Sequence, residues 1–352
     1  MPRPRKEQVN LEATPYYHVI GRCVRRARLC GTDPLTGQDC SHRKAWIQAR
    51  MALLVECFAM DLGAFTILDN HYHALLHVDA ERARAWSEHE VARRWLRLFR
   101  GPQPVRRWMD GEALSGTELE LVHHQIGVWR ERLYDLSWFM KCLNEYIARR
   151  ANEEDHCKGR FWEERFVSQA LLDDPAVLGC MVYIDLNPVR AGIAATPEES
   201  DYTSVQQRIR DWQGITPGGP QPLRPRLLRL PGDDEPAGVE RGPLGFRLRD
   251  YLELVDWSGR AVRTEKAGAI PAQLPPILER LRLDGGRWLR QMRGAPGPRP
   301  VALGGAAGIR RFTEVTRRRW IKHARLASCF EPLLRGPDDS ASHGLPVRTG
   351  PD

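Results

Sequence analysis

Apolar and polar residues alternate in two short stretches near the start of the chain and recur with helical spacing between them. Residues 14–22 and 64–78 have the period-2 pattern of strands, whereas residues 42–62 carry apolar side chains at the spacing of a helix. Ser41 stands where it can cap that helix. The order strand, helix, strand predicts the first half of an α+β unit, in which an antiparallel sheet packs against helices.

The two faces of the second predicted strand differ in chemistry. Its even positions are mostly apolar, whereas its odd positions include Asp69, His71, His73 and His77. Side chains alternate along a strand, so His71 and His73 point to the same side, one pleat apart. Such a pair can share a divalent metal ion, because neutral imidazole is the commonest protein metal ligand. An exposed strand with incidental histidines gives the same pattern. We expect the apolar face to pack on helices and the histidine face to stay open.

Later segments continue the pattern of helices. Four of them have apolar residues at helical spacing: 83–99, 117–133, 136–154 and 174–186. The third carries Tyr146 at the edge of its apolar stripe. Residues 158–169 lead into a last strand, and Pro188 stops the helix that follows.

The composition changes near residue 214. Residues 214–246 are rich in Pro, Gly and Arg and are interpreted as a linker between residues 1–213 and a C-terminal accessory region, 247–352. Within that region, residues 309–327 predict a strongly basic helix with aromatic side chains. Basic and aromatic residues together suit nucleic-acid binding, although a solvated helix face has a similar composition.

Overall composition narrows the functional classes. The chain has 53 Lys and Arg against 45 Asp and Glu, a net charge of +8, which makes nucleic acid a reasonable partner unless the source proteome is generally Arg-rich. Its 8 cysteines form no C-x-x-C pair, which argues against a zinc ribbon and favours reduced thiols in a cytoplasmic protein. No apolar run reaches the length of about 18 residues that a membrane span needs.

Three phrases together resemble a known family. They are L-D-N-H-Y-H-A-L-L at 68–76, K-G-R-F-W-E-E-R-F at 158–166 and Y-I-D-L-N-P-V-R-A-G at 183–192. They resemble the HUH endonucleases, and most closely the single-tyrosine insertion-sequence transposases and REP-associated tyrosine transposases. The resemblance extends over roughly residues 16–205. It implies that residues 80–135 are a helical insertion, because the smallest members of the family have a far shorter connection there. It implies that residues 1–213 form an HUH-type, ferredoxin-like antiparallel sheet with helices on one face.

The resemblance also implies a reaction. His71 and His73 would hold Mg²⁺ or Mn²⁺, and Tyr146 would attack a DNA phosphate to give a 5′-phosphotyrosine link. Tyr146 stands one residue before the position that the family tyrosine takes when the later phrases are aligned. A third metal ligand is expected one turn after the tyrosine, where this chain has Arg150, so Asn152 and Glu153 are the nearest candidates.

Single-stranded DNA hairpins or repeat ends are the expected partner, and a homodimer is possible because related proteins can share the tyrosine between subunits. Arginines proposed to contact DNA are Arg22, Arg25, Arg26, Arg165, Arg190, Arg317, Arg318 and Arg319. Two alternatives stay open. One is a catalytically inactive, domesticated protein that binds DNA hairpins or repeats. The other is a metallohydrolase unrelated to DNA, for which the chain lacks clustered carboxylates.

Overall fold

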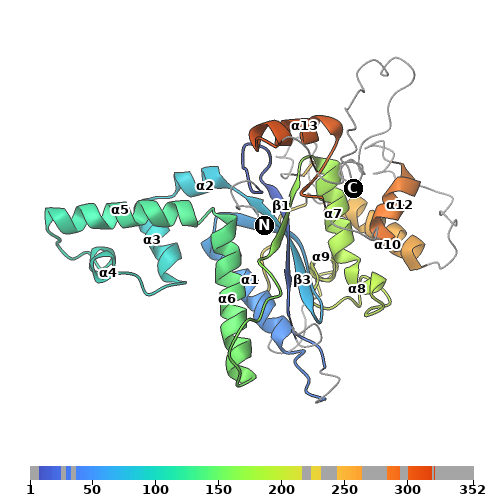
Figure 1. Ribbon diagram of the computed structural model, residues 1–352, viewed down its shortest axis with the longest axis horizontal. Coiled ribbons are helices and arrows are strands. Elements are labelled where there is room, and N and C mark those ends of the chain that lie inside the picture. Colours follow the sequence, from blue (N-terminus) through green and yellow to red (C-terminus); the bar gives the residue numbers. More distant parts are fainter. Residues whose placement is uncertain are drawn as a thin grey trace, which may run out of the picture.

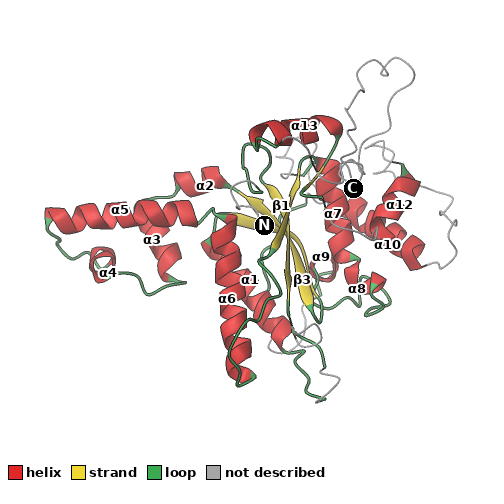
Figure 2. Ribbon diagram, in the orientation of Figure 1, coloured by secondary structure: helices red, strands yellow, loops and turns green. Residues whose placement is uncertain are grey.

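The centre of the computed structural model is a five-stranded sheet with strand order β2-β3-β1-β4-β5 (Figures 1 and 2). The structure describes residues 8–24, 29–32, 37–215, 223–230, 244–263, 284–293, 300–318 and 321. The strands are β1 (Tyr16–Arg22), β2 (Met60–Ile67), β3 (His71–Val78), β4 (Val167–Leu171) and β5 (Ala302–Leu303). The first four pair antiparallel and β5 pairs parallel with β4, so the α+β prediction is confirmed but the sheet is mixed.

The stretch predicted as one strand, residues 64–78, is a hairpin. β2 and β3 pair antiparallel, and the N–H of Leu68 donates to the carbonyl of His71 at 2.9 Å to close the turn. The single-strand prediction was wrong because Asp69 and Asn70, two adjacent polar residues, interrupt the alternation and form the turn between the two strands. The preceding helix, α1 (Arg43–Cys57), also ends earlier than predicted, because Phe58 adopts extended backbone and starts the path into β2.

Helices cover both faces of the sheet, so the expectation of helices on one face was wrong. α1 and α6 (Leu136–Glu154) pack on the face that carries Tyr17, Val19 and Tyr72. α7 (Asp174–Asp185) and α9 (Ser204–Trp212) pack on the other face, around Leu75. Leu75 lies between His73 and His77 on the histidine face of β3 and is fully buried. It packs against the helices that cover this face.

The predicted insertion forms an arm that extends away from the sheet (Figure 1). It contains four helices rather than two: α2 (Ala80–Ala85), α3 (Glu88–Leu96), α4 (Gln103–Met109) and α5 (Gly116–Arg132). The first predicted helix is divided at Ser87, whose extended backbone and side-chain oxygen cap α3 by accepting from the N–H of Glu90. Trp95 and Trp129 stack at 5.4 Å between ring centroids and tie α3 to α5.

The described parts of the C-terminal region share the core of the N-terminal part. α10 (Leu248–Arg263) and α12 (Gly285–Arg293) lie beside α7, and α10 also contacts α8 (Asn187–Arg190) of the N-terminal part. β5 extends the sheet and is followed by α13 (Ala306–Val315). Of the basic helix predicted over 309–327, the structure shows α13, which ends at Val315 and is followed by Arg317 with a positive φ of 51°. Residues 319–320 and 322–327 of that prediction lie outside the described residues. In the part of the chain that the structure describes, no helix is both long and apolar enough to cross a membrane.

A buried polar cluster joins α7, α9 and α10 beneath the histidine face of the sheet. Asp185 is fully buried and accepts hydrogen bonds from the hydroxyls of Ser204 and Tyr251 and from the N–H of Val205. Arg208 lies beside it, also buried, and donates to the carbonyls of Gly63 and Leu228 at 3.0 Å each. Burial raises the pKa of Asp185 to about 6, against the lowering effect of these hydrogen bonds and of the Arg208 charge.

This pKa predicts a pH-dependent stability. Asp185 is protonated more readily in the folded chain than in the unfolded chain, so folding is favoured below the unfolded pKa of 3.8, and this stability is lost as the pH rises to about 6. At about 1.4 kcal/mol per tenfold change in proton affinity, the loss above that pH is on the order of 3 kcal/mol. Urea unfolding of wild type and Asp185→Asn at pH 4.5 and 7.5 measures it. Wild type should lose stability relative to Asp185→Asn as the pH rises from 4.5 to 7.5. An equal difference in the free energy of unfolding at both pH values would contradict the assignment.

Candidate active site

The histidines of β3 lie on one face of the sheet together with His18 of β1. The β1–β3 register sets His18 opposite Leu75 and Ile20 opposite His73, which confirms that His71 and His73 share a side. The rings of His71 and His73 are 4.9 Å apart between centroids. The expectation that this face stays open was wrong, because α7 covers it and His73 is only 1% exposed.

Hydrogen bonds fix the orientation of both histidine rings. Nδ1 of His73 lies 2.9 Å from Nε2 of His18, and Nδ1 of His71 lies 2.5 Å from the side-chain oxygen of Asn70. Both bonds engage the Nδ1 atom, so each ring would have to bind a metal ion through Nε2. Such a partner on the other ring nitrogen is the arrangement that commonly orients metal-binding histidines.

Tyr183 of α7 is the tyrosine that the structure brings to these histidines. Its ring meets those of His18 and His73 edge-on, at centroid distances of 6.3 and 6.0 Å. The guanidinium carbon of Arg190 lies 4.5 Å from the centroid of the Tyr183 ring. Because α7 is the helix that packs over the histidine face, its half-buried tyrosine comes close to them.

Asn187 follows Tyr183 by four residues, which is about one helical turn. Its side chain is 8% exposed, and its Nδ2 atom has no hydrogen-bond partner among the described residues. A buried amide N–H₂ without a protein partner can donate to an acceptor such as a phosphate oxygen or a water molecule, but it does not bind a cation. Asn187 thus places a buried polar group about one helical turn after Tyr183.

Tyr146 lies in a different place. It belongs to α6, which is held on the opposite face of the sheet, where the hydroxyl of Tyr72 donates to Asn144 at 2.5 Å. The Tyr146 side chain is 36% exposed and accepts a hydrogen bond from Nη1 of Arg150 at 3.0 Å. The structure therefore does not bring Tyr146 to His71 or His73, and its role as nucleophile stays a prediction.

The two candidates for the third metal ligand lie near the end of α6, away from the histidine face. Asn152 donates to the carbonyl of Gly159 at 3.1 Å and accepts from the thiol of Cys157, so it holds the loop after the helix. Glu153 is exposed. Neither is brought together with the predicted metal-binding pair.

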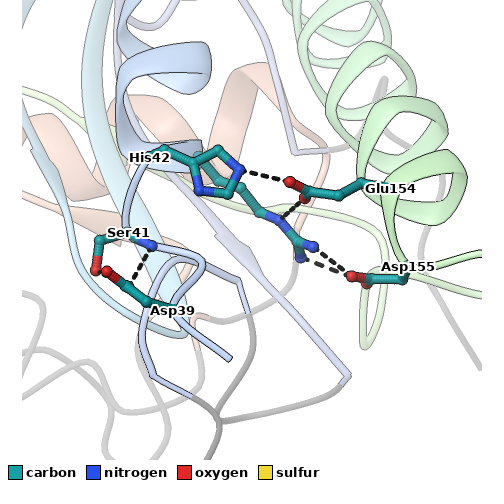
Figure 3. Close-up of polar contacts among 6 residues, drawn as sticks. Asp39, Ser41, His42, Glu154 and Asp155 are labelled. Atoms are coloured by element: carbon teal, nitrogen blue, oxygen red, sulfur yellow. Dashed lines mark hydrogen bonds and ion pairs between the residues drawn. The ribbon is translucent and has the colours of Figure 1, made fainter. Parts of the chain in front are cut away.

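The acidic residues that follow Glu153 hold α6 to the start of α1 (Figure 3). Arg43, which is fully buried, donates from Nε to Glu154 at 2.6 Å and from Nη2 to Asp155. Nε2 of His42 lies 2.6 Å from the same Glu154 carboxylate. These carboxylates are therefore engaged in a structural ion-pair cluster.

The arginines predicted to contact DNA are spread over the surface. Arg22 is exposed at the end of β1, opposite His71 in the register, and Arg165 lines a groove of about 580 Å³ beside α6. Arg190 covers Tyr183, and Arg317 and Arg318 follow α13. The remaining predicted contacts lie outside the described residues: Arg25, Arg26 and Arg319.

The potential metal donors that the structure brings together on the histidine face are the imidazoles of His71 and His73. Among the described residues, no group of three or more His, Cys, Asp and Glu side chains is arranged to hold a metal ion. Imidazole nitrogens suit divalent transition-metal ions, whereas oxygen donors suit Mg²⁺ or Mn²⁺.

Comparison with solved structures finds a similarity to one described as a REP-associated tyrosine transposase bound to a REP hairpin. The sequence identity is 12%, the TM-score is 0.31, and the alignment covers 58% of this chain and 82% of that one. No protein-family model and no curated protein matches the chain. Because similarity of this extent identifies no family, the function has to follow from the residues of this chain.

Proposed function

We propose that this chain is a transposase-like, DNA-binding protein that cleaves and rejoins single-stranded DNA through Tyr183. The observation that carries the proposal is the position of the Tyr183 ring beside His18 and His73, on the same face of the sheet. The sequence phrase that contains Tyr183 also contains Asn187 and Arg190, so one short segment supplies three of the polar groups at this site.

The reaction would use these side chains in distinct roles. His71 and His73, with Asn187, would hold Mg²⁺ or Mn²⁺, and the bound ion would supply charge stabilisation and orientation for the scissile phosphate. The Tyr183 oxygen attacks phosphorus and loses its proton, while the bond to the 3′-oxygen breaks and that oxygen leaves as a hydroxyl. The product is a 5′-phosphotyrosine link, and attack by a 3′-hydroxyl on that link rejoins the strand.

A groove beside α6 provides a surface that suits single-stranded DNA. Its walls carry aromatic and basic side chains on which bases can stack and phosphates can bind. These are Lys141, Arg160, Phe161, Trp162, Arg165 and Phe166. Glu145 and Glu164 also line it, so the groove is mixed in charge rather than uniformly basic.

A catalytically inactive protein that binds DNA hairpins or repeats is the second candidate. The observation that favours it is the burial of His73, which is 1% exposed beneath α7. A DNA phosphate could reach this ring only if α7 or its neighbours moved. Such a protein would keep the aromatic and basic groove and form no covalent link.

A covalent-adduct assay separates the two candidates. The purified chain is mixed with radiolabelled single-stranded hairpin DNA that flanks its own gene, with and without Mn²⁺, and run on a denaturing gel. A metal-dependent shifted band supports strand cleavage. Binding on a native gel without a covalent band supports the inactive protein, and absence of both rejects the proposed function.

His18 is expected to orient His73 for metal binding. His18→Phe removes the ring nitrogen that meets Nδ1 of His73, whereas His18→Gln keeps a polar group that can accept a hydrogen bond. Loss of such a partner typically weakens metal affinity by about 10- to 100-fold. Titration calorimetry with Mn²⁺ should show that loss for the Phe variant and partial recovery for the Gln variant. Equal affinities in all three proteins would contradict the role.

A further inference from the structure

Trp46, Arg150, Tyr146 and Arg50 form a continuous line of side chains across α1 and α6. The guanidinium carbon of Arg150 lies 3.9 Å from the centroid of the Trp46 ring, and that of Arg50 lies 4.6 Å from the centroid of the Tyr146 ring. Nη1 of Arg150 also donates to the Tyr146 hydroxyl at 3.0 Å. The two arginines therefore flank the tyrosine, and we call this set the α1–α6 clamp.

The clamp has an excess of positive charge that the described residues do not balance. Arg50 donates from Nε to the carbonyl of Cys142 at 3.2 Å, and neither Arg50 nor Arg150 forms an ion pair with a carboxylate in the described part of the chain. The neighbouring Arg149, in contrast, pairs with Glu145. Arg150 and Tyr146 are exposed, so an anion can approach from solvent.

Stacking on aromatic rings orders both guanidinium groups without consuming their hydrogen-bond donors. Cation–π stacking holds a guanidinium in place over the ring face, and its planar N–H fork suits two phosphate oxygens. The Tyr146 hydroxyl accepts from Arg150 and still has a proton to donate. Two ordered cations and a hydroxyl donor form a site for a tetrahedral oxyanion.

We propose, on the basis of the DNA binding proposed above, that the α1–α6 clamp binds the phosphate backbone of the nucleic acid. The clamp lies on α1 and α6, on the opposite side of the sheet from Tyr183, so it would hold a part of the DNA distant from the point of cleavage. Backbone contacts of this kind position a nucleic acid without reading its sequence. In this proposal the exposed Tyr146 donates to a backbone phosphate on the face of the sheet that α1 and α6 cover.

Fluorescence anisotropy with a labelled single-stranded hairpin tests the clamp. Arg50→Gln combined with Arg150→Gln should weaken binding on the order of tenfold per arginine at low salt. The slope of log affinity against log salt should fall by about 0.7 to 0.9 for each phosphate that the variant no longer neutralises, and hairpins of different sequence should be affected alike. Arg149→Gln is the matched control, since this residue is next on the same helix and already paired with Glu145.

The lysine variants separate charge from geometry. Arg50→Lys combined with Arg150→Lys should keep most of the salt slope and lose part of the affinity, because lysine keeps the charge without the planar fork. Equal affinity and slope in wild type and the glutamine variant, with both proteins folded by circular dichroism, would overturn the clamp. Wild type that binds DNA but forms no covalent adduct would overturn the cleavage by Tyr183 and leave the clamp standing.

Discussion

Tyr183→Phe is expected to abolish the covalent DNA adduct, with a loss of about ten-thousandfold or more in the rate of strand cleavage. The variant removes only the hydroxyl oxygen, which is the atom that would attack phosphorus. Removing a nucleophile typically costs several orders of magnitude, because no other group takes over its bond to the substrate. The ring stays in place, so it still meets His18, His73 and Arg190. DNA affinity on native gels should therefore change little while the adduct disappears.

Two other tyrosines serve as comparisons in the same assay. Tyr134→Phe should form the adduct as wild type does, because its hydroxyl donates to Glu131 at the base of the arm. Tyr146→Phe should also form the adduct, but at higher DNA concentrations, because the α1–α6 clamp loses one donor. An adduct that persists in Tyr183→Phe and vanishes in Tyr146→Phe would reverse the assignment, and would require α6 of a second subunit to reach the histidines.

Much of the fold follows from periodicity. α6 and α7 fall close to where they were predicted. α6 has one buried apolar stripe, whereas α7 is apolar and buried on almost all sides and ends just before Pro188. The hairpin of β2 and β3 was missed because the alternation was followed across Asp69 and Asn70, although two adjacent polar residues of these types favour a turn. The second helical layer depends on Leu75 and on residues more than 100 positions later, and long-range packing of this kind leaves no local pattern.

The site was only partly predictable for a related reason. The shared face of His71 and His73 is a property of any strand, so the sequence is enough to predict it. The choice of tyrosine depends on which helix covers which face of the sheet, and that is a tertiary property. A local signal did exist, since Tyr183 and Asn187 are one helical turn apart in the same phrase. His18 gave no such signal, because its partner His73 lies 55 residues away in the sequence.

Arg43→Met is expected to destabilise the fold by about 3 kcal/mol, a large fraction of the stability of a typical domain. The side chain is fully buried and serves both Glu154 and Asp155 (Figure 3). Removing one partner of a buried ion pair costs about 3 to 5 kcal/mol, because the remaining charge stays desolvated and unpaired. The Glu154 and Asp155 side chains are 27% and 14% exposed, so water can relieve part of the penalty and the lower end applies.

Urea unfolding followed by circular dichroism measures this loss, and variants of the partners identify its cause. Arg149→Met removes an arginine that is 79% exposed and paired with Glu145 on the same helix, so its cost should stay below about 1 kcal/mol. If the penalty comes from the unpaired carboxylates, adding Glu154→Gln and Asp155→Asn to Arg43→Met should recover a large part of the stability. A triple variant no more stable than Arg43→Met would mean that the loss comes from the packing of the arginine stem. Because Arg43 joins the start of α1 to the end of α6, Arg43→Met should also weaken DNA binding by the α1–α6 clamp, whose side chains come from these two helices.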